Sequence, residues 1–382
     1  MYTIHAYGEM NADRVRIDAY AAALARTIRP EATVLDLGAG AGLMTLMACK
    51  LGAAHVIAVE PNNLITVARE IVKAAGFANR VEFVHDVSTA VTPSRRCDVV
   101  VSDLRGVVPQ FGQHIPSIVD VRTRWLADGG TLIPQRDIVY ASVVESTRSY
   151  EAHFKGWLPD ADGVPFAAAR RLCANRPRKV YLEERELLCA PAAWINLDYP
   201  TILSADFDSG VELSTRRDGV GHGLVLWFES MLAAGIELSN RPGRPQLIYG
   251  QLFLPWPEPV TLRAGDTVQV RLRARLIHDD YVWSWTSILP NRGSASTAPP
   301  RFDQSTLQGE TWSPEFLSRL DVRARPELTA KGRAATRVLS AIDGTTATED
   351  IAACLATEFP DEFADAQHAA RFISKLHAEF WR

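Results

Sequence analysis

The first third of the chain alternates short apolar runs with segments of helical periodicity. ATVLDLGAG is an apolar run that ends in glycines, and MTLMACKLGA after it has helical spacing. HVIAVE, RVEFVH and CDVVVSD are further apolar runs, and TVAREIVKAAG lies between the first two of them. Strands that alternate with helices of this length are typical of parallel βαβ units. The pattern predicts an α/β domain with a doubly wound sheet over residues 1–136.

The periodicity changes after about Arg136. DIVYASVVES alternates apolar and polar residues at period two, and similar segments separated by polar turns continue to about Trp285. This alternation predicts an antiparallel β-barrel or sandwich over residues 137–290. Residues 149–177 interrupt it with an irregular, helical segment that carries Phe154, Trp157, Leu158 and Phe166.

The last part of the chain has a third pattern. NRGSASTAPPRFDQS is rich in Gly, Ser and Pro, which predicts a linker over residues 291–325. After it, apolar residues recur at three- and four-residue spacing in RAATRVLSAI, EDIAACLATEF and HAARFISKLHAEFW. This spacing predicts a small helical unit over residues 326–382.

Composition limits the function classes. The chain has 382 residues, of which 47% are hydrophobic, and this is enough for two or three domains. Its net charge of -4 argues against general nucleic-acid binding. The sequence shows neither a run of about 18 apolar residues nor a secretory signal, so we expect a cytoplasmic protein without a membrane span. Five scattered cysteines form no CxxC pair and predict no zinc site.

A glycine loop with a following acid is the main chemical signal. Asp36, Gly38, Gly40 and Gly42 lie in VLDLGAGAG, between a predicted strand and a predicted helix. Such a loop lets the backbone approach a ligand, and the helix N-terminus directs free N–H groups at it. Glu60 ends the next predicted strand, where a carboxylate can accept both hydroxyls of a ribose. The combination predicts a nucleotide-type cofactor site, and the alternative is a tight turn without a ligand.

The glycine spacing distinguishes two cofactor classes. A dehydrogenase would carry GxGxxG, whereas this loop has GxGxG preceded by Asp36. The spacing resembles the first motif of class I methyltransferases, and the resemblance covers about residues 32–134. It implies S-adenosyl-L-methionine as cofactor, with the adenine held at HDV by Asp86 and Val87. Ser102, at the end of CDVVVSD, is a further candidate for the cofactor site.

Several segments most resemble the protein arginine methyltransferases. YGEMNADRVRIDAY is similar to that family's lead-in helix, and GHGLVLWFES and GQLFLPWPEPVTLRAGDTV are similar to segments of its barrel. The resemblance spans about residues 2–289. It implies that Met10 packs near the sulfonium and that Arg16 pairs with the methionine carboxylate, a role that suits a planar guanidinium. It also implies a homodimer, with residues 149–177 as the dimerisation arm.

The catalytic positions depart from the family pattern. Members of the family grip a guanidinium with two glutamates, and these positions fall on Asp103 and Gly112 here. A His-Trp pair falls on Ile248 and Tyr249. One shorter acid does not reproduce a two-sided grip, so ordinary histone-style arginine methylation is not expected. Asp103 is the candidate to orient an N–H acceptor or to act as a base.

Two more residues of the same loop are catalytic candidates. Arg105 can bind a carboxylate of the acceptor, and His114 can take a proton because its ordinary pKa is near neutrality. The alternatives are a surface arginine and a loop histidine that only forms hydrogen bonds. His278, Asp279 and Asp280 form a polar cluster that we interpret as a solvated barrel turn.

The helical tail resembles the small winged-helix peptide chaperone of pyrroloquinoline quinone biosynthesis. The shared features in ELTAKGRAATRVLSAIDGTTATEDIAACLATEFPD are a leucine before a basic-Gly turn, the IDG turn and a Thr-rich cap. The same cap is also typical of any helix N-terminus. The resemblance implies a peptide acceptor that is recruited by strand addition.

Three functions follow as hypotheses. The first is a methyltransferase that acts on a peptide or a small amino-acid-like metabolite in specialised metabolism. The second is an arginine N-methyltransferase in which Asp103 forms part of a modified grip. The third is a catalytically silent binding module, which the Gly at 112 and the Ile at 248 favour.

Overall fold

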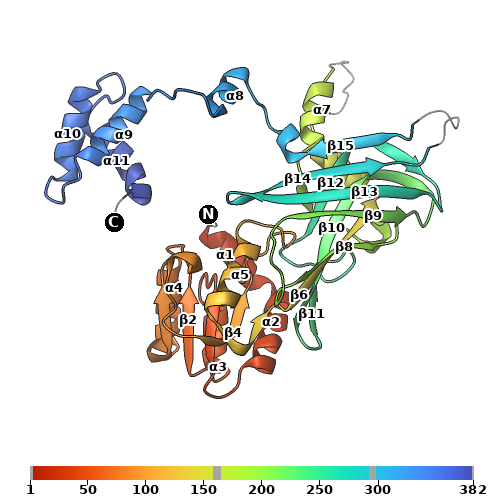
Figure 1. Ribbon diagram of the computed structural model, residues 1–382, viewed down its shortest axis with the longest axis horizontal. Coiled ribbons are helices and arrows are strands. Elements are labelled where there is room, and N and C mark those ends of the chain that lie inside the picture. Colours follow the sequence, from red (N-terminus) through yellow and green to blue (C-terminus); the bar gives the residue numbers. More distant parts are fainter. Residues whose placement is uncertain (1–2, 158–164, 292–297, 381–382) are drawn as a thin grey trace. The chain divides into compact units, whose positions relative to one another are not determined.

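The computed structural model describes residues 3–157, 165–291 and 298–380. The chain forms two compact units, Met1–Thr311 and Trp312–Arg382 (Figure 1). Within the described residues, no helix has both the length and the apolar character that a membrane span requires.

The first unit begins with the predicted parallel sheet. Its strand order is β3-β2-β1-β4-β5, and every neighbouring pair is parallel. Leu37, the last residue of β1, pairs with Val59 of β2 and with Ser102 of β4. The carboxyl ends of these strands therefore meet at one edge, as in other doubly wound sheets. The strands are β1 (Thr33–Leu37), β2 (His55–Val59), β3 (Val81–Val84), β4 (Cys97–Ser102) and β5 (Leu126–Ile133).

Helices connect these strands and lead into the first of them. The two lead-in helices precede β1, and their side chains are only partly apolar. Buried Tyr20 and Leu24 of the second lead-in helix join the core that the sheet shares with the barrel. The helices are α1 (Ile4–Ala12), α2 (Arg14–Thr27), α3 (Leu43–Lys50), α4 (Ile65–Ala74) and α5 (His114–Arg124).

Two antiparallel sheets form the second part of this unit. One has the order β7-β12-β10-β6-β8, with β11 paired to β10, and the other has the order β15-β14-β13-β9. Trp256 of the first sheet donates to the Ser287 hydroxyl of the second at 3.0 Å, so the sheets share one core. The strands are β6 (Arg136–Val144), β7 (Arg178–Val180), β8 (Ala192–Asp198), β9 (Phe207–Ser214), β10 (Gly219–Ala233), β11 (Ile236–Ser239), β12 (Gln251–Leu262), β13 (Thr267–Ile277), β14 (Asp280–Ile288) and β15 (Arg301–Ser305).

The predicted linker contains the last of these strands. β15 pairs with β14 from Ser284 to Ile288, inside the range that we expected to be a linker. The buried Gln304 amide donates to the carbonyls of Ala174 and Pro255, which ties β15 to the rest of the barrel. Composition alone missed this strand because RFDQS lies directly beyond a Pro- and Ser-rich run. The first unit therefore continues beyond residue 290 to Thr311.

The predicted arm divides into a buried and an exposed part. It contains α6 (Thr147–His153) and α7 (Ala167–Ala174), and the predicted arm residue Leu158 lies outside the described residues. Phe154 is fully buried against Tyr150 and the barrel, so this residue is a core residue of its own chain. Trp157 is 41% exposed, and its ring lies 5.5 Å from that of Phe166.

The second unit is helical, as its periodicity predicts. Its largest helices share a small core of Ala334, Val338, Ile351, Ala352, Leu355, Phe363, Ala369 and Ile373. Residues 312–380 hold helices and no strand, so the expected recruitment of a peptide by strand addition has no strand edge here. The helices are α8 (Pro314–Leu320), α9 (Ala330–Ser340), α10 (Thr348–Glu358) and α11 (Ala366–Phe380).

Candidate active site

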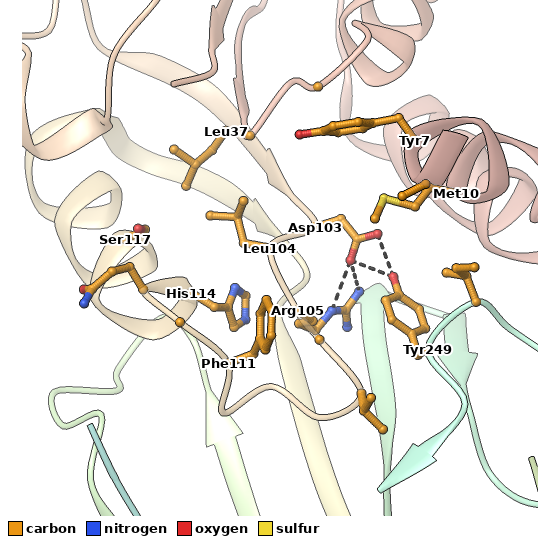
Figure 2. A pocket seen from close by; sticks show the side chains of 18 of the residues that line it. Tyr7, Met10, Leu37, Asp103, Leu104, Arg105, Phe111, His114, Ser117 and Tyr249 are labelled. Atoms are coloured by element: carbon orange, nitrogen blue, oxygen red, sulfur yellow. Dashed lines mark hydrogen bonds and ion pairs between the residues drawn. The ribbon is translucent and has the colours of Figure 1, made fainter. Parts of the chain in front are cut away.

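A cavity of about 940 Å³ opens at the carboxyl edge of the parallel sheet (Figure 2). Its glycine-loop end is lined by residues 36–41, 43–44, 59–61 and 86–88. Its barrel end is lined from residues 103–117, 248–252 and 280–283, which come from the loop after β4, from α5 and from the antiparallel sheets. Crevices at this edge of a doubly wound sheet are the usual place for a ligand.

The glycine loop has the backbone that its sequence predicts. Gly38, Gly40 and Gly42 all have positive φ, at 77°, 52° and 80°. Gly38 and Gly40 line the cavity, whereas Gly42 caps the N-terminus of α3 and does not line it. A Cβ at Gly42 would lie 2.9 Å from the Ala68 Cβ, so this glycine allows α3 and α4 to pack closely.

The two acids at this end are held differently. Each Glu60 carboxylate oxygen accepts one backbone N–H at 2.8 Å, one from Gly40 and the other from Asn62. A carboxylate has about four acceptor positions, so Glu60 keeps capacity for two ligand hydroxyls. Asp36 accepts from the Thr45 hydroxyl at 2.5 Å and is only 2% exposed. Burial raises the pKa of Asp36 to about 6, although the bond from Thr45 opposes this rise.

The other cofactor-site candidates near this end take different places. Asp86 and Val87 both line the cavity, and the Asp86 carboxylate accepts from the Val87 backbone N–H at 2.8 Å. Val87 is 45% exposed, which leaves an apolar side chain for a ring to pack against. Ser102 is only 1% exposed and is not a lining residue; its carbonyl accepts from Tyr20 at 3.1 Å. Ser102 therefore lies in the wall of the site, because its strand is buried on both faces.

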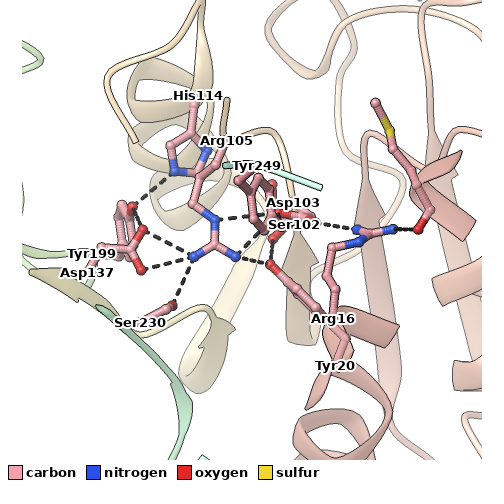
Figure 3. Close-up of polar contacts among 11 residues, drawn as sticks. Arg16, Tyr20, Ser102, Asp103, Arg105, His114, Asp137, Tyr199, Ser230 and Tyr249 are labelled. Atoms are coloured by element: carbon pink, nitrogen blue, oxygen red, sulfur yellow. Dashed lines mark hydrogen bonds and ion pairs between the residues drawn. The ribbon is translucent and has the colours of Figure 1, made fainter. Parts of the chain in front are cut away.

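Met10 and Arg16 join the cavity from the lead-in helices. The Arg16 guanidinium pairs with Asp103 and donates to the Met10 carbonyl at 2.9 Å (Figure 3). Its Nε is buried without a hydrogen-bond partner among the described residues. An orphaned guanidinium N–H beside the cavity fits the binding of a ligand carboxylate.

Asp103 is bonded on both carboxylate oxygens. It pairs with Arg16 and accepts from Arg105 at 3.3 Å, and the Tyr249 hydroxyl donates to it at 2.6 Å. Burial by itself would raise the pKa of Asp103, but Arg105 and Arg16 together hold it below its ordinary value. Asp103 is therefore an anion at neutral pH whose charge is already compensated.

Arg105 is buried, contrary to the expectation of a group open to the acceptor. None of its side chain is exposed, and it pairs with Asp137 at 3.0 Å and donates to the Ser230 hydroxyl at 2.9 Å (Figure 3). It also donates to Tyr20, and its guanidinium carbon lies 4.8 Å from the centre of the Phe228 ring. Its N–H groups are used by partners from the barrel and α2. Arg105 thus joins the loop after β4 to the barrel instead of meeting an acceptor carboxylate.

His114 is likewise a buried group and not a base near neutrality. Its Nε2 lies 3.0 Å from the Tyr199 hydroxyl, which itself donates to Asp137 at 2.7 Å. The tyrosine oxygen therefore accepts from Nε2–H, and the imidazole is neutral with Nδ1 as its acceptor. Burial, together with the nearby Arg105, lowers the pKa of His114 to about 3. His114 lines the cavity from the start of α5, but its low pKa does not suit the predicted role of proton acceptor at neutral pH.

Gly112, Ile248 and His278 lie in turns or loops at the barrel end. Gly112 has a positive φ of 45°, and Ile248 donates its backbone N–H to Asp13 at 2.7 Å. His278 also has a positive φ, as a tight turn requires, and its carbonyl accepts from the Gln113 amide at 2.7 Å. This confirms the interpretation of His278 as a turn residue, and adds a contact between that turn and the loop after β4.

Sequence reasoning missed the residues that complete the buried cluster at the barrel end. These are Tyr20, Asp137, Tyr199 and Ser230, together with Tyr249, which the sequence singled out only by its family position and not as a partner of Asp103. Four of them bond to Asp103 or Arg105, and Tyr199 bonds to Asp137 and His114; each of these hydrogen bonds spans 32 or more positions along the chain, so no local motif marks them. The one available signal was Asp137, an acid in an otherwise apolar strand, DIVYASVV.

Comparisons with known proteins find similarity to methyltransferases. The family model for ribosomal protein L11 methyltransferase (PrmA) matches residues 20–154. Protein arginine N-methyltransferase 1 of Saccharomyces cerevisiae is 25% identical over 281 residues, 71% of this chain and 80% of that protein. Arginine N(omega)-methyltransferase of Streptomyces achromogenes subsp. streptozoticus is 28% identical over 267 residues, 68% and 73% of the two chains.

Solved structures show the same fold. The Trypanosoma brucei PRMT1 enzyme-prozyme heterotetrameric complex with AdoHcy matches with a TM-score of 0.72 and 22% identity, over 80% of this chain and 98% of that one. Protein arginine methyltransferase 10 of Arabidopsis thaliana matches with a TM-score of 0.69 and 20% identity, over 79% and 97%.

The parallel sheet, its glycine loop and these likenesses define a class I methyltransferase that uses S-adenosylmethionine. Within that class, the antiparallel barrel after the sheet gives the chain the fold of the protein arginine methyltransferases, to which it is similar.

Proposed function

We propose that this enzyme methylates an uncharged nitrogen of a peptide or of a small amino-acid-like metabolite in specialised metabolism. The observation that carries the proposal is the saturation of Asp103 by Arg16, Arg105 and Tyr249. Around Asp103, the two arginines Arg16 and Arg105 balance the charges of Asp103 and Asp137. A guanidinium cation would meet no uncompensated buried anion there, so a neutral acceptor fits better.

The proposed cofactor contacts follow from the unused bonding capacity at the glycine-loop end. Glu60 accepts the ribose hydroxyls, and the orphaned Nε of Arg16 binds the methionine carboxylate. Asp86 and Val87 hold the adenine, and Met10 packs beside the sulfonium. When bound, S-adenosylmethionine supplies an electrophilic methyl group for an in-line displacement.

The chain's own residues orient the acceptor and keep water away from it. Three described groups at the barrel end have pKa values away from neutrality: that of His114 is about 3, that of Asp103 is lowered, and burial raises that of Tyr249 well above its ordinary value. This set suits a neutral amine, which attacks with its lone pair and loses its proton afterwards.

Labelled cofactor tests this function directly. The enzyme is incubated with uncharged peptides and amino-acid-like metabolites, and separately with a basic histone peptide. We expect label in members of the first group and little in the second. Robust methylation of the histone peptide by the wild-type protein would overturn the proposal.

Arginine N-methylation is the second candidate. The relatives from Saccharomyces and Streptomyces carry that activity in their names, and Asp103 stands at the first of the two glutamate positions. Free arginine in the same labelling assay separates the candidates, because label in free arginine supports the second and contradicts the first.

We also propose that the chain forms a homodimer through residues 149–177. Trp157 and Phe166 form an aromatic pair of which the tryptophan is 41% exposed, a surface that a partner would cover. Light scattering at micromolar concentration measures the mass. A mass of one chain would contradict this assembly, and Trp157→Ala is expected to shift a dimer toward monomer.

A further inference from the structure

The loop after β4 carries a buried amide whose hydrogen bonds are not made. Gln110 is only 3% exposed, and neither its amide nitrogen nor its amide oxygen has a partner within the described chain. It lines the barrel end of the cavity. A buried polar group without a partner costs about 1–3 kcal/mol, so such a side chain needs a reason.

Other glutamines of the first unit show how unusual this is. The buried Gln251 amide donates to the Asn240 carbonyl at 2.6 Å, and its oxygen accepts from the Leu182 N–H at 2.9 Å. Gln113, three residues after Gln110 and also lining the cavity, donates to the His278 carbonyl and to Asp279. Three glutamines of the described chain are buried. Gln251 and Gln304 each have at least one hydrogen-bond partner, and Gln110 has none.

The loop around Gln110 is fixed on both sides. The Asn240 amide donates to the Val107 carbonyl at 2.9 Å, which ties the loop to the barrel. The Phe111 ring packs so closely on Gly106 that a Cβ there would lie 2.6 Å from the ring. These contacts hold Gln110 in place before any ligand arrives, which lowers the entropy lost on binding.

The free polar atoms near this loop are neutral. Besides the Gln110 amide, the other buried cavity-lining atom of this segment without a described partner is His114 Nδ1. Asp103 is saturated, while Asp280 and Lys179 bring exposed charges of opposite sign to the lining. An amide offers a donor and an acceptor side by side, and its complement is another planar group with both.

We propose that Gln110 binds a carboxamide or peptide group of the acceptor, next to the atom that is methylated. This inference rests on the proposed function, since it names the group by which an uncharged acceptor is recognised. Gln110 is a positioning residue: it pairs with the acceptor's amide N–H and carbonyl while the nucleophilic nitrogen lies elsewhere in the cavity.

Benzamide is a suitable probe, because it joins a carboxamide to an apolar body. Its affinity is measured by ligand-observed NMR on the full chain saturated with S-adenosylhomocysteine, with benzamidinium and toluene as comparison probes. We expect the wild type to prefer benzamide to benzamidinium, and Gln110→Met to weaken benzamide about tenfold or more, the effect of losing one to two buried hydrogen bonds. Toluene binding is expected to stay within twofold.

Two further variants sharpen the test. Gln110→Glu adds an uncompensated carboxylate at the same place and is expected to reverse the preference toward benzamidinium. Gln113→Met makes the same chemical change at an amide that is already bonded, and is expected to leave benzamide affinity within twofold. S-adenosylhomocysteine affinity, measured by calorimetry, reports whether each variant is folded.

The two proposals fail in different ways. Unchanged benzamide affinity in folded Gln110→Met overturns the Gln110 site, whatever the enzyme methylates. Methylation of a basic histone peptide overturns the proposed function, even when Gln110→Met has lost benzamide binding.

Discussion

At the glycine-loop end of the cavity, Glu60 and Arg16 retain hydrogen-bonding capacity that the protein does not use. At the barrel end, Asp103 and Arg105 are bonded to each other and to residues of the barrel. The first arrangement leaves polar groups for a charged ligand, whereas the second uses its charges to hold the protein together. The difference indicates that a charged residue in a cavity is available to a ligand only when its protein partners leave it unsatisfied.

The largest expected effect is a loss of stability when the buried ion pairs of Arg105 at the barrel end are removed. Arg105→Met leaves Asp137 without its buried cationic partner and removes one of the two arginines that pair with Asp103, so we expect the free energy of unfolding in urea to fall by about 3–5 kcal/mol. Arg105→Lys keeps the positive charge, and its free energy of unfolding is expected to fall less than that of Arg105→Met. Arg271→Met, at an exposed ion pair with Asp208, is the control and should change little. If Arg105→Met is as stable as wild type, the buried ion pairs of Arg105 do not stabilise the fold.

The second prediction tests whether the Asp36 carboxylate, at the glycine-loop end, lowers the free energy of unfolding. A rise in the pKa of Asp36 from 3.8 to about 6 means that the folded chain holds this proton more tightly than the unfolded chain. Stability therefore falls as pH rises from about 4 to about 6, by up to about 3 kcal/mol. Asp36→Asn should be more stable than wild type above pH 6, with the difference vanishing below pH 4.

Thermal unfolding across this pH range measures the effect, with the exposed Asp128→Asn as a matched control. A stability difference that does not depend on pH would show that the Asp36 carboxylate is not the cause. A simultaneous loss of S-adenosylhomocysteine binding in Asp36→Asn would indicate that this destabilising charge serves the cofactor.

The third prediction sharpens the assignment of the ribose site. Glu60→Ala removes the carboxylate with spare acceptor positions, and calorimetry should show S-adenosylhomocysteine binding weakened by about 1–3 kcal/mol. Glu70→Ala changes an exposed acid on α4 and should leave the affinity unchanged. An undiminished affinity in Glu60→Ala would remove Glu60 from the site.

The smallest expected effect concerns the second unit. Its core is separate from that of the first, so deletion of residues 312–382 should leave the melting temperature of the first unit and its S-adenosylhomocysteine affinity nearly unchanged. Methylation of small acceptors should persist in the truncated chain. A selective loss of activity on peptides would support a role of the tail in recruiting them, and loss of cofactor binding would contradict the independence of the units.

Much of the fold was predictable, because period and turn chemistry are local. The alternation of strands and helices before Arg136 and the period of two after it predict the parallel sheet and the antiparallel barrel that the structure shows. The strand at Arg301–Ser305 was missed because its pairing partner, β14, and not its composition, makes it a strand. The boundary between the two units, after Thr311, follows from that pairing.

The sequence by itself determined the glycine-loop end, because its parts follow one another in a strand, a turn, a helix and a second strand. Gly38, Gly40 and Glu60 come together through parallel pairing of adjacent elements alone. The tertiary structure decided the barrel end, where Arg105 meets Tyr20, Asp137 and Ser230 from three other elements. Whether an arginine in a loop faces a ligand or lies buried depends on which partners the fold brings to it, and no local pattern records that.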